Sequence, residues 1–270
     1  MIQLTEASAV IHIVESIASI SVCISCIELL SYPQQLNDNG VMSWRVFQLR
    51  HRWFVRGLLA NVLDRIFSYP AFLAIIVIRL AAASLLLVVA PNDTQRAVLV
   101  GIVAVMSLCL PLRSPYGMDG ADQMTVTTFG GLALVHLCSG PTVDKAGLWF
   151  LTLQVCLSYL TAGVVKATSP VWRDGSGLTG VFSTRAYGNA WLALRLTEHP
   201  ALGRLLSWSV IVAECLFSLV LVLPMPFALA FLIWGVMFHF LGAVIMGLNT
   251  FFWSFVALYP AIIYCVTQYG

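Results

Sequence analysis

The stretch YLTAGVVKATSPVWRDGSGL, residues 159–178, decides the fold of this chain, because a long apolar run meets an amine there and then breaks. Residues 148–165 carry no charge and are long enough to cross a bilayer, so Lys166 is the first charge after a membrane span. Pro170 disfavours a continued helix in the residue before it, and the following DGSG supplies turn residues. The pattern therefore places Lys166 where a transmembrane helix gives way to a loop.

Two roles are open to Lys166. Its long stem can carry the ammonium to the lipid headgroups, in which case the residue marks a helix end and does no chemistry. Alternatively the side chain faces a protein cavity, where loss of hydration favours the neutral amine and lets it act as a base.

The composition indicates a polytopic integral membrane protein. Of the 270 residues, 60% are hydrophobic and only 10% are charged, so water-facing side chains cannot cover most of the chain. The net charge of +2 is too small to imply a nucleic-acid partner, and no basic run is interleaved with aromatic residues. Seven cysteines, nearly all inside apolar segments, argue against a disulfide framework.

We expect an all-α bundle of about eight transmembrane helices that forms a single membrane domain over residues 1–270. The apolar segments fall near residues 8–31, 70–91, 96–112, 123–139, 146–167, 205–223, 227–247 and 249–268. The first segment places His12 three residues before Glu15 on one helix face, and we expect that face to turn toward the bundle.

Two connectors have the pattern of amphipathic helices at the membrane surface. Between the first two spans, Phe54, Leu58, Val62 and Ile66 recur every four residues among several arginines. The connector after Lys166 repeats this character over residues 191–196. These two connectors hold most of the basic residues, so the positive-inside rule predicts that both are cytoplasmic and that the N-terminus lies outside.

Four ionisable residues lie inside predicted spans, and each should face the bundle interior because lipid exposure would cost several kcal/mol. Arg79 and Glu214 have opposite charge, and we predict a structural ion pair between them. His136 and His239 lack a carboxylate, cysteine or second histidine at ligand spacing, so we expect no metal site. Asn249 is a polar residue at a break shortly after the glycine-containing segment of His239.

The loop LRSPYGMDGADQM, residues 112–124, carries Asp119 and Asp122 at the border of the fourth span. Two acids in a turn-rich loop could bind a cation, but solvated turn residues explain them more simply. The chain has no G-x-S-x-G, no H-E-x-x-H and no phosphate-binding loop. Charges near the middle of spans keep a small-solute transporter open as a second class of function.

The residues around Lys166 resemble the hallmark of the HTTM superfamily, the membrane domain shared with vitamin K-dependent gamma-glutamyl carboxylase. The hallmark reads Y-x-x-A-G-x-x-K followed by W-x-x-G, and here it comprises Tyr159, Ala162, Gly163, Lys166, Trp172 and Gly175. The pair Phe238–His239 ahead of M-G-L-x-x-F, and the D-G-A-D loop at residues 119–122, are similar to later and earlier parts of the same family.

The resemblance implies that Lys166 is a general base and that His239 lines the site. The candidate site also includes Tyr159, Trp172, Gly175, Asp119 and Asp122 from these motifs. His136 and Asn249 are added as polar residues within or beside predicted spans. In the carboxylase the matching lysine deprotonates a reduced quinone, vitamin K hydroquinone. A reduced quinone is thus a candidate cofactor by this analogy alone, and the residues themselves identify none. The carboxylase's large soluble region has no counterpart in these 270 residues, which argues against glutamate carboxylation itself.

Short members of the superfamily resemble the SdpB type, multi-pass proteins of the bacterial plasma membrane. With a small SdpA-like partner subunit they mature an exported SdpC-like peptide toxin, and we expect such a peptide to be the substrate. This resemblance places the connector after Lys166 on the exoplasmic side, opposite to the arginine count, and we follow the resemblance. The alternative function is a small-solute or peptide transporter, or an immunity protein, without catalysis.

Overall fold

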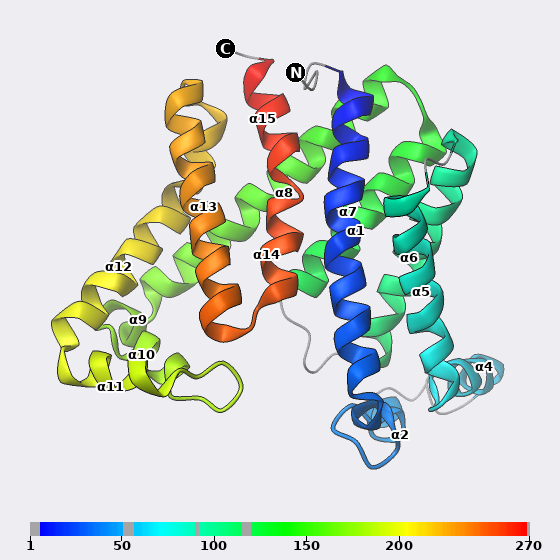
Figure 1. The fold of residues 1–270 in the computed structure, drawn as a ribbon, viewed down its shortest axis with the longest axis horizontal. Helices are drawn as coiled ribbons and strands as arrows, with labels where there is room; N and C mark the ends of the chain where they lie inside the picture. The colour runs from blue at the N-terminus through cyan, green and yellow to red at the C-terminus, as the bar shows by residue number, and fades with distance from the viewer. Residues whose placement is uncertain (1–5, 51–56, 90–91, 115–119, 269–270) are drawn as a thin grey trace. The chain divides into compact units, whose positions relative to one another are not determined.

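A computed structural model describes residues 6–50, 57–89, 92–114 and 120–268 of the chain (Figure 1). Within these residues all regular secondary structure is helical, as the sequence predicted. Seven of the described helices are long and apolar enough to cross a membrane. They are α1 (Ala7–Ser31), α5 (Ala71–Val88), α6 (Asp93–Arg113), α8 (Pro141–Thr168), α12 with a 3-10 extension (Pro200–Leu221), α13 (Met225–Met246) and α14 with α15 (Asn249–Thr267). The all-α, polytopic membrane fold is therefore confirmed.

The predicted fourth span, residues 123–139, falls on α7 (Gly120–Cys138). This helix of 19 residues packs along α6 but is not among the seven, because its first half is rich in polar side chains. The loop expected before it is shorter than predicted, since the helix already begins at Gly120.

The chain forms two compact units where the sequence suggested one membrane domain. The N-terminal unit comprises residues 11–144, and the C-terminal unit comprises residues 145–270 together with the first ten residues.

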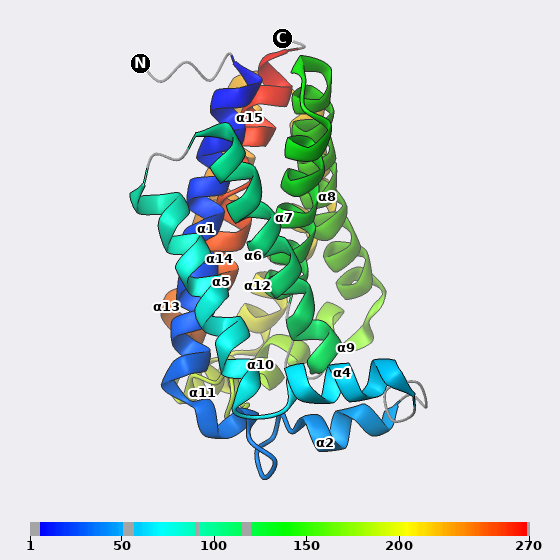
Figure 2. The same cartoon turned by 90° about the vertical axis from the view of Figure 1, so that its right-hand side faces the viewer.

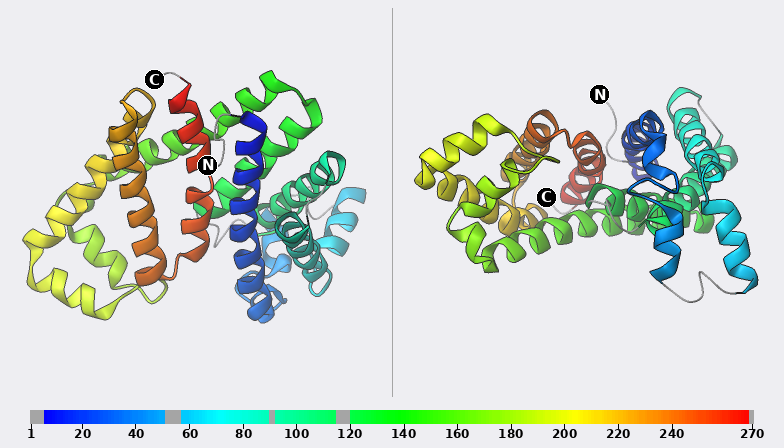
Figure 3. Two further views of the ribbon diagram at one scale, coloured as in Figure 1. Left: turned by 45° about the horizontal axis from the view of Figure 1, so that its top comes forward. Right: turned by 90° about the horizontal axis from the view of Figure 1, so that it is seen from below.

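In the N-terminal unit, the connector between the first two spans contains α2 (Trp44–Phe47), a 3-10 turn (Gln48–Arg50) and α4 (Leu58–Phe67). Both helices lie across the lower end of the unit, side by side when seen from below (Figures 2 and 3). The Trp44 and Phe67 rings meet edge to face at 5.0 Å, which holds the connector together.

The amphipathic pattern of α4 appears in the structure as a stripe of exposed apolar side chains. Its members are Leu58, Leu59, Val62 and Ile66. Ala60 and Phe67 are buried on the other side of the helix. This is the distribution expected of a helix at a membrane surface. The predicted pattern also included Phe54, which lies outside the described residues.

Arg113, the last residue of α6, fastens this connector to the spans. Its guanidinium donates hydrogen bonds to the backbone carbonyls of Phe67 (2.8 Å), Met42 (2.8 Å) and Leu36 (2.6 Å). It also lies 4.5 Å from the centre of the Phe72 ring. Three carbonyls that helical bonds leave free are thus satisfied by one buried side chain.

In the C-terminal unit, three short helices join α8 to α12: α9 (Pro170–Arg173), α10 (Ser176–Phe182) and α11 (Ala190–Glu198) (Figure 1). The helix predicted at residues 191–196 is α11, which exposes Trp191 and Leu194 and buries Leu196. The chain then passes through α12 (Pro200–Leu216) and α13 to α14 (Asn249–Val256) and α15 (Tyr259–Thr267).

Candidate functional site

The site in the C-terminal unit begins with a close approach between α8 and α12. A β-carbon on Gly163 would lie 2.7 Å from the backbone nitrogen of Cys215 and 2.8 Å from its Sγ. A larger residue would push the helices apart, so glycine is required at this position. Lys166 follows three residues later on the same face of α8, next to this contact.

Lys166 forms an ion pair with Glu214 of α12. Its Nζ donates to Oε1 at 2.8 Å and to Oε2 at 2.7 Å, so both carboxylate oxygens accept a hydrogen bond from one ammonium. The Glu214 side chain is 4% exposed and that of Lys166 is 19% exposed. The pair therefore lies mainly inside the protein, which weakens the interpretation of Lys166 as a simple lipid anchor.

The W-x-x-G part of the motif covers this pair. The Trp172 ring lies 5.3 Å from Lys166 Nζ, within the range of a cation–π contact. Gly175 has a φ of +89°, and a β-carbon there would collide with the backbone nitrogen of Arg204 in α12. Hydrogen bonds from the side chain and backbone N–H of Ser176 keep the pKa of Asp174 below its ordinary value. The turn is thus fixed against the start of α12.

Two turns before Lys166, Tyr159 lies at the centre of a buried hydrogen-bonded chain. Its hydroxyl is 2.7 Å from His239 Nε2 and 2.8 Å from the Tyr259 hydroxyl. Gly235 makes room for both hydroxyls, because a β-carbon there would overlap the Tyr259 hydroxyl. Three helices, α8, α13 and α15, therefore contribute one side chain each to a single polar chain inside an apolar bundle.

Aromatic rings surround this chain. The Tyr159 ring stacks on Phe217 with centroids 3.9 Å apart, and the His239 ring stacks on Phe255 at 4.4 Å. The rings exclude water and leave the hydroxyl and imidazole groups as one another's partners. The predicted neighbours Tyr159 and His239 are thus brought together, whereas the participation of Tyr259 and Gly235 had no signal in the sequence.

The predicted pairing of Arg79 with Glu214 is corrected by the structure. Arg79 donates instead to Ser107 Oγ at 3.0 Å and to Ser25 Oγ at 3.2 Å, and Glu214 takes Lys166 as its partner. The prediction matched charges by sign and by depth in their spans. It compared only ionisable residues inside the spans, so Lys166, at the end of its span, was not considered as a partner of Glu214.

His136, predicted to line the site, belongs to the N-terminal unit. Its Nε2 meets Oε1 of Glu15, and Arg96 Nη1 donates to Oε2 of the same carboxylate at 2.8 Å. Glu15 is fully buried, which confirms that this face of α1 turns inward. The structure thus places His136 in a cluster with Glu15 and Arg96 in the N-terminal unit.

The remaining predicted site residues lie at helix starts or outside the described residues. Asp122 stands in the first turn of α7, and Asp119 is outside the described residues. Asn249 begins α14 after Gly247, whose φ of +75° ends α13, so the predicted break is present. Among the residues described, no group of three or more histidine, cysteine or acidic side chains could hold a metal ion.

The fold and the site define a class: a polytopic α-helical membrane protein with a buried amine–carboxylate pair beside a tyrosine–histidine chain. Comparison of the chain with protein-family models, curated proteins and solved structures finds no match. Such a site can hold a proton on either partner of the pair without changing its total charge, and it can present a neutral amine to a weak acid.

Proposed function

We propose that this chain is an HTTM-type protein of the bacterial plasma membrane that matures an exported antimicrobial peptide. The proposal takes Lys166 as the general base and His239 as a residue of the site wall. It places the chain nearest to the SdpB type, working with an SdpA-like partner subunit on an SdpC-like peptide.

The observation that carries the proposal is the Lys166–Glu214 pair. Three other residues of the motif have roles at or near this pair. Tyr159 joins the buried polar chain, Gly163 allows the close contact of helices, and Trp172 covers the ammonium. A lysine that only marked a helix end would need neither a buried carboxylate nor this close contact.

Glu214 supplies what an ammonium needs in order to become a base. The proton can pass from Nζ to Oε2 along their 2.7 Å hydrogen bond, which leaves a neutral amine beside a neutral carboxylic acid. Burial favours this neutral form over two separated charges. The free electron pair of the amine can then accept a proton from a weakly acidic group that enters the site.

A reduced quinone would supply such a weakly acidic hydroxyl group when bound. The residues present are compatible with a planar aromatic ring, since Trp172 borders Lys166 and stacked rings line the neighbouring chain. Lys166 would take the hydroxyl proton, and Trp172 would help to keep water from the amine.

Lys166→Arg is the discriminating test, because arginine keeps the charge but cannot release its proton. We expect normal expression and membrane insertion, and no mature peptide by mass spectrometry of the exported fraction. Lys145→Arg, at the chain's other lysine, is the matched control and should mature the peptide normally. Maturation by Lys166→Arg at a rate close to the parent's would remove Lys166 as the base.

The alternative, transport or immunity without catalysis, makes a different prediction in the same experiment. Loss of the protein would then leave the mass of the peptide unchanged while the peptide stays in the cell or kills its producer. A change in the mass of the exported peptide, dependent on Lys166, supports the enzyme.

A further inference from the structure

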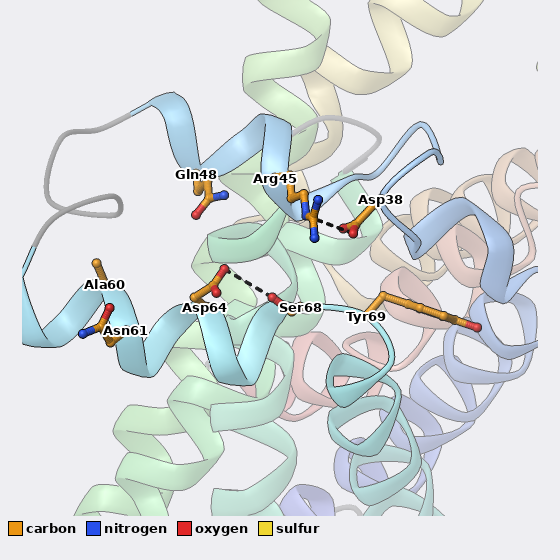
Figure 4. A pocket seen from close by; sticks show the side chains of 8 residues that line it. All are labelled: Asp38, Arg45, Gln48, Ala60, Asn61, Asp64, Ser68 and Tyr69. Atoms are coloured by element: carbon orange, nitrogen blue, oxygen red, sulfur yellow. Dashed lines mark hydrogen bonds and ion pairs between the residues drawn. The ribbon is translucent and has the colours of Figure 1, made fainter.

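A polar pocket lies in the N-terminal unit, and none of the residues assigned above to the candidate site lines it. It has a volume of about 340 Å³ and lies between α2 and α4, as Figure 4 shows. The side chains that matter for its chemistry are Asp38, Arg45, Gln48, Asn61, Asp64 and Ser68. Its size is within the range of small-molecule sites.

The pocket lies at the membrane surface. The connector that forms it joins two helices that are long and apolar enough to cross a membrane, from the end of α1 at Ser31 to the start of α5 at Ala71. The exposed stripe of α4, in which Leu58 is 83% exposed, would be costly in water and matches the boundary between headgroups and acyl chains. A pocket on this helix pair therefore opens among lipid headgroups.

Both signs of charge line the pocket. Asp64 Oδ1 accepts hydrogen bonds from Trp44 Nε1 (3.1 Å) and Ser68 Oγ (3.2 Å), and its Oδ2 accepts none from the residues described. Across the pocket, Arg45 Nε donates to Asp38 Oδ2 at 2.9 Å, which leaves the two terminal nitrogens of the guanidinium available. An unused carboxylate oxygen thus faces a guanidinium with unused donors.

We propose that this pocket binds the zwitterionic headgroup of an aminophospholipid such as phosphatidylethanolamine. Its primary ammonium has three N–H donors for Asp64 Oδ2 and the amide oxygens of Asn61 and Gln48. Its phosphate fits the free nitrogens of Arg45, and its acyl chains run along the apolar stripe of α4. Phosphatidylcholine has the same charges without N–H donors, and phosphatidylglycerol lacks the cation.

The full-length chain, reconstituted with equal amounts of these three lipids, tests the proposal by native mass spectrometry. We expect phosphatidylethanolamine to be retained about tenfold over phosphatidylcholine, the effect of one charge-assisted hydrogen bond. Asp64→Asn should remove most of this preference. Arg65→Gln, on the same helix but outside the pocket lining, is the control and should keep it.

Asn61→Leu fills the pocket without touching the Trp44–Asp64 bond, so it separates loss of the lipid from loss of the fold. It should also remove the preference. In detergent without lipid, binding of free phosphoethanolamine would assign the same pocket chemistry to a soluble zwitterion. Equal retention of the ethanolamine and choline lipids, or equal effects of Asp64→Asn and Arg65→Gln, would overturn the proposal.

Discussion

Replacing either member of the Lys166–Glu214 pair should destabilise the C-terminal unit. The loss in free energy of unfolding should depend on which of the two residues is replaced. At the observed distances of 2.7 and 2.8 Å, two unit charges attract by about 6 kcal/mol at an effective dielectric constant of about 20. Lys166→Met leaves a carboxylate that is 4% exposed, and we expect a loss of about 3 to 5 kcal/mol. Glu214→Leu leaves a lysine that is 19% exposed and can reach the headgroups, so its loss should be smaller.

The double variant Lys166→Met/Glu214→Leu removes both charges and should be close to the parent in stability. The free energy of unfolding can be measured by titration with a denaturing detergent in mixed micelles, followed by tryptophan fluorescence. The coupling energy between the two positions should therefore be at least about 3 to 5 kcal/mol, the sum of the two single losses. Arg79→Met combined with Glu214→Leu is the control and should be additive. The assignment of the pair would be refuted if the stability losses of Lys166→Met and Glu214→Leu simply added in the double variant. It would also be refuted if Arg79→Met and Glu214→Leu showed an equal coupling energy.

Three further predictions follow from other parts of the molecule. Arg113→Met strands three buried carbonyls of the first connector and should lower the free energy of unfolding by about 3 kcal/mol, measured in the same titration. Gly235→Ala overlaps the Tyr259 hydroxyl and should cost about 1 to 3 kcal/mol, whereas an unchanged stability would show that the chain of hydroxyls has room to move. Ser183→Cys in a cysteine-free background should react with an impermeant thiol reagent in whole cells if the second connector is exoplasmic, and labelling only after lysis would reverse that orientation.

Much of the fold could be predicted because the bilayer imposes a simple rule on composition. A span must satisfy its backbone within a helix and expose apolar side chains, so hydropathy alone located all seven of the strongly apolar spans. The motif around Lys166 falls on the close contact between α8 and α12. Its glycine at 163 and lysine at 166 lie three residues apart, a spacing that puts both on one helix face.

The partners within the site could not be predicted from the same patterns. Hydropathy gives the depth of a charge in its span but not the direction in which its helix faces, so Glu214 was matched with Arg79. The contribution of Tyr259 depends on where α15 packs, and a tyrosine in an apolar segment gives no sign of this. Gly235 is one of 19 glycines, and nothing in the sequence distinguishes it from the others. The need for glycine at this position is clear only from the structure, where the Tyr159 and Tyr259 hydroxyls lie against it.

The neutrality of the Lys166–Glu214 pair reconciles stability with reactivity at this position. A lone buried lysine would either stay charged at a high cost or turn toward the headgroups, and neither state presents an amine inside the protein. With Glu214 the total charge is zero whether the proton is on nitrogen or on oxygen, so the proton can move without leaving an uncompensated charge inside the protein. The close contact at Gly163 holds the two groups at hydrogen-bond distance, and this contact is therefore as important to the proposed chemistry as the lysine itself.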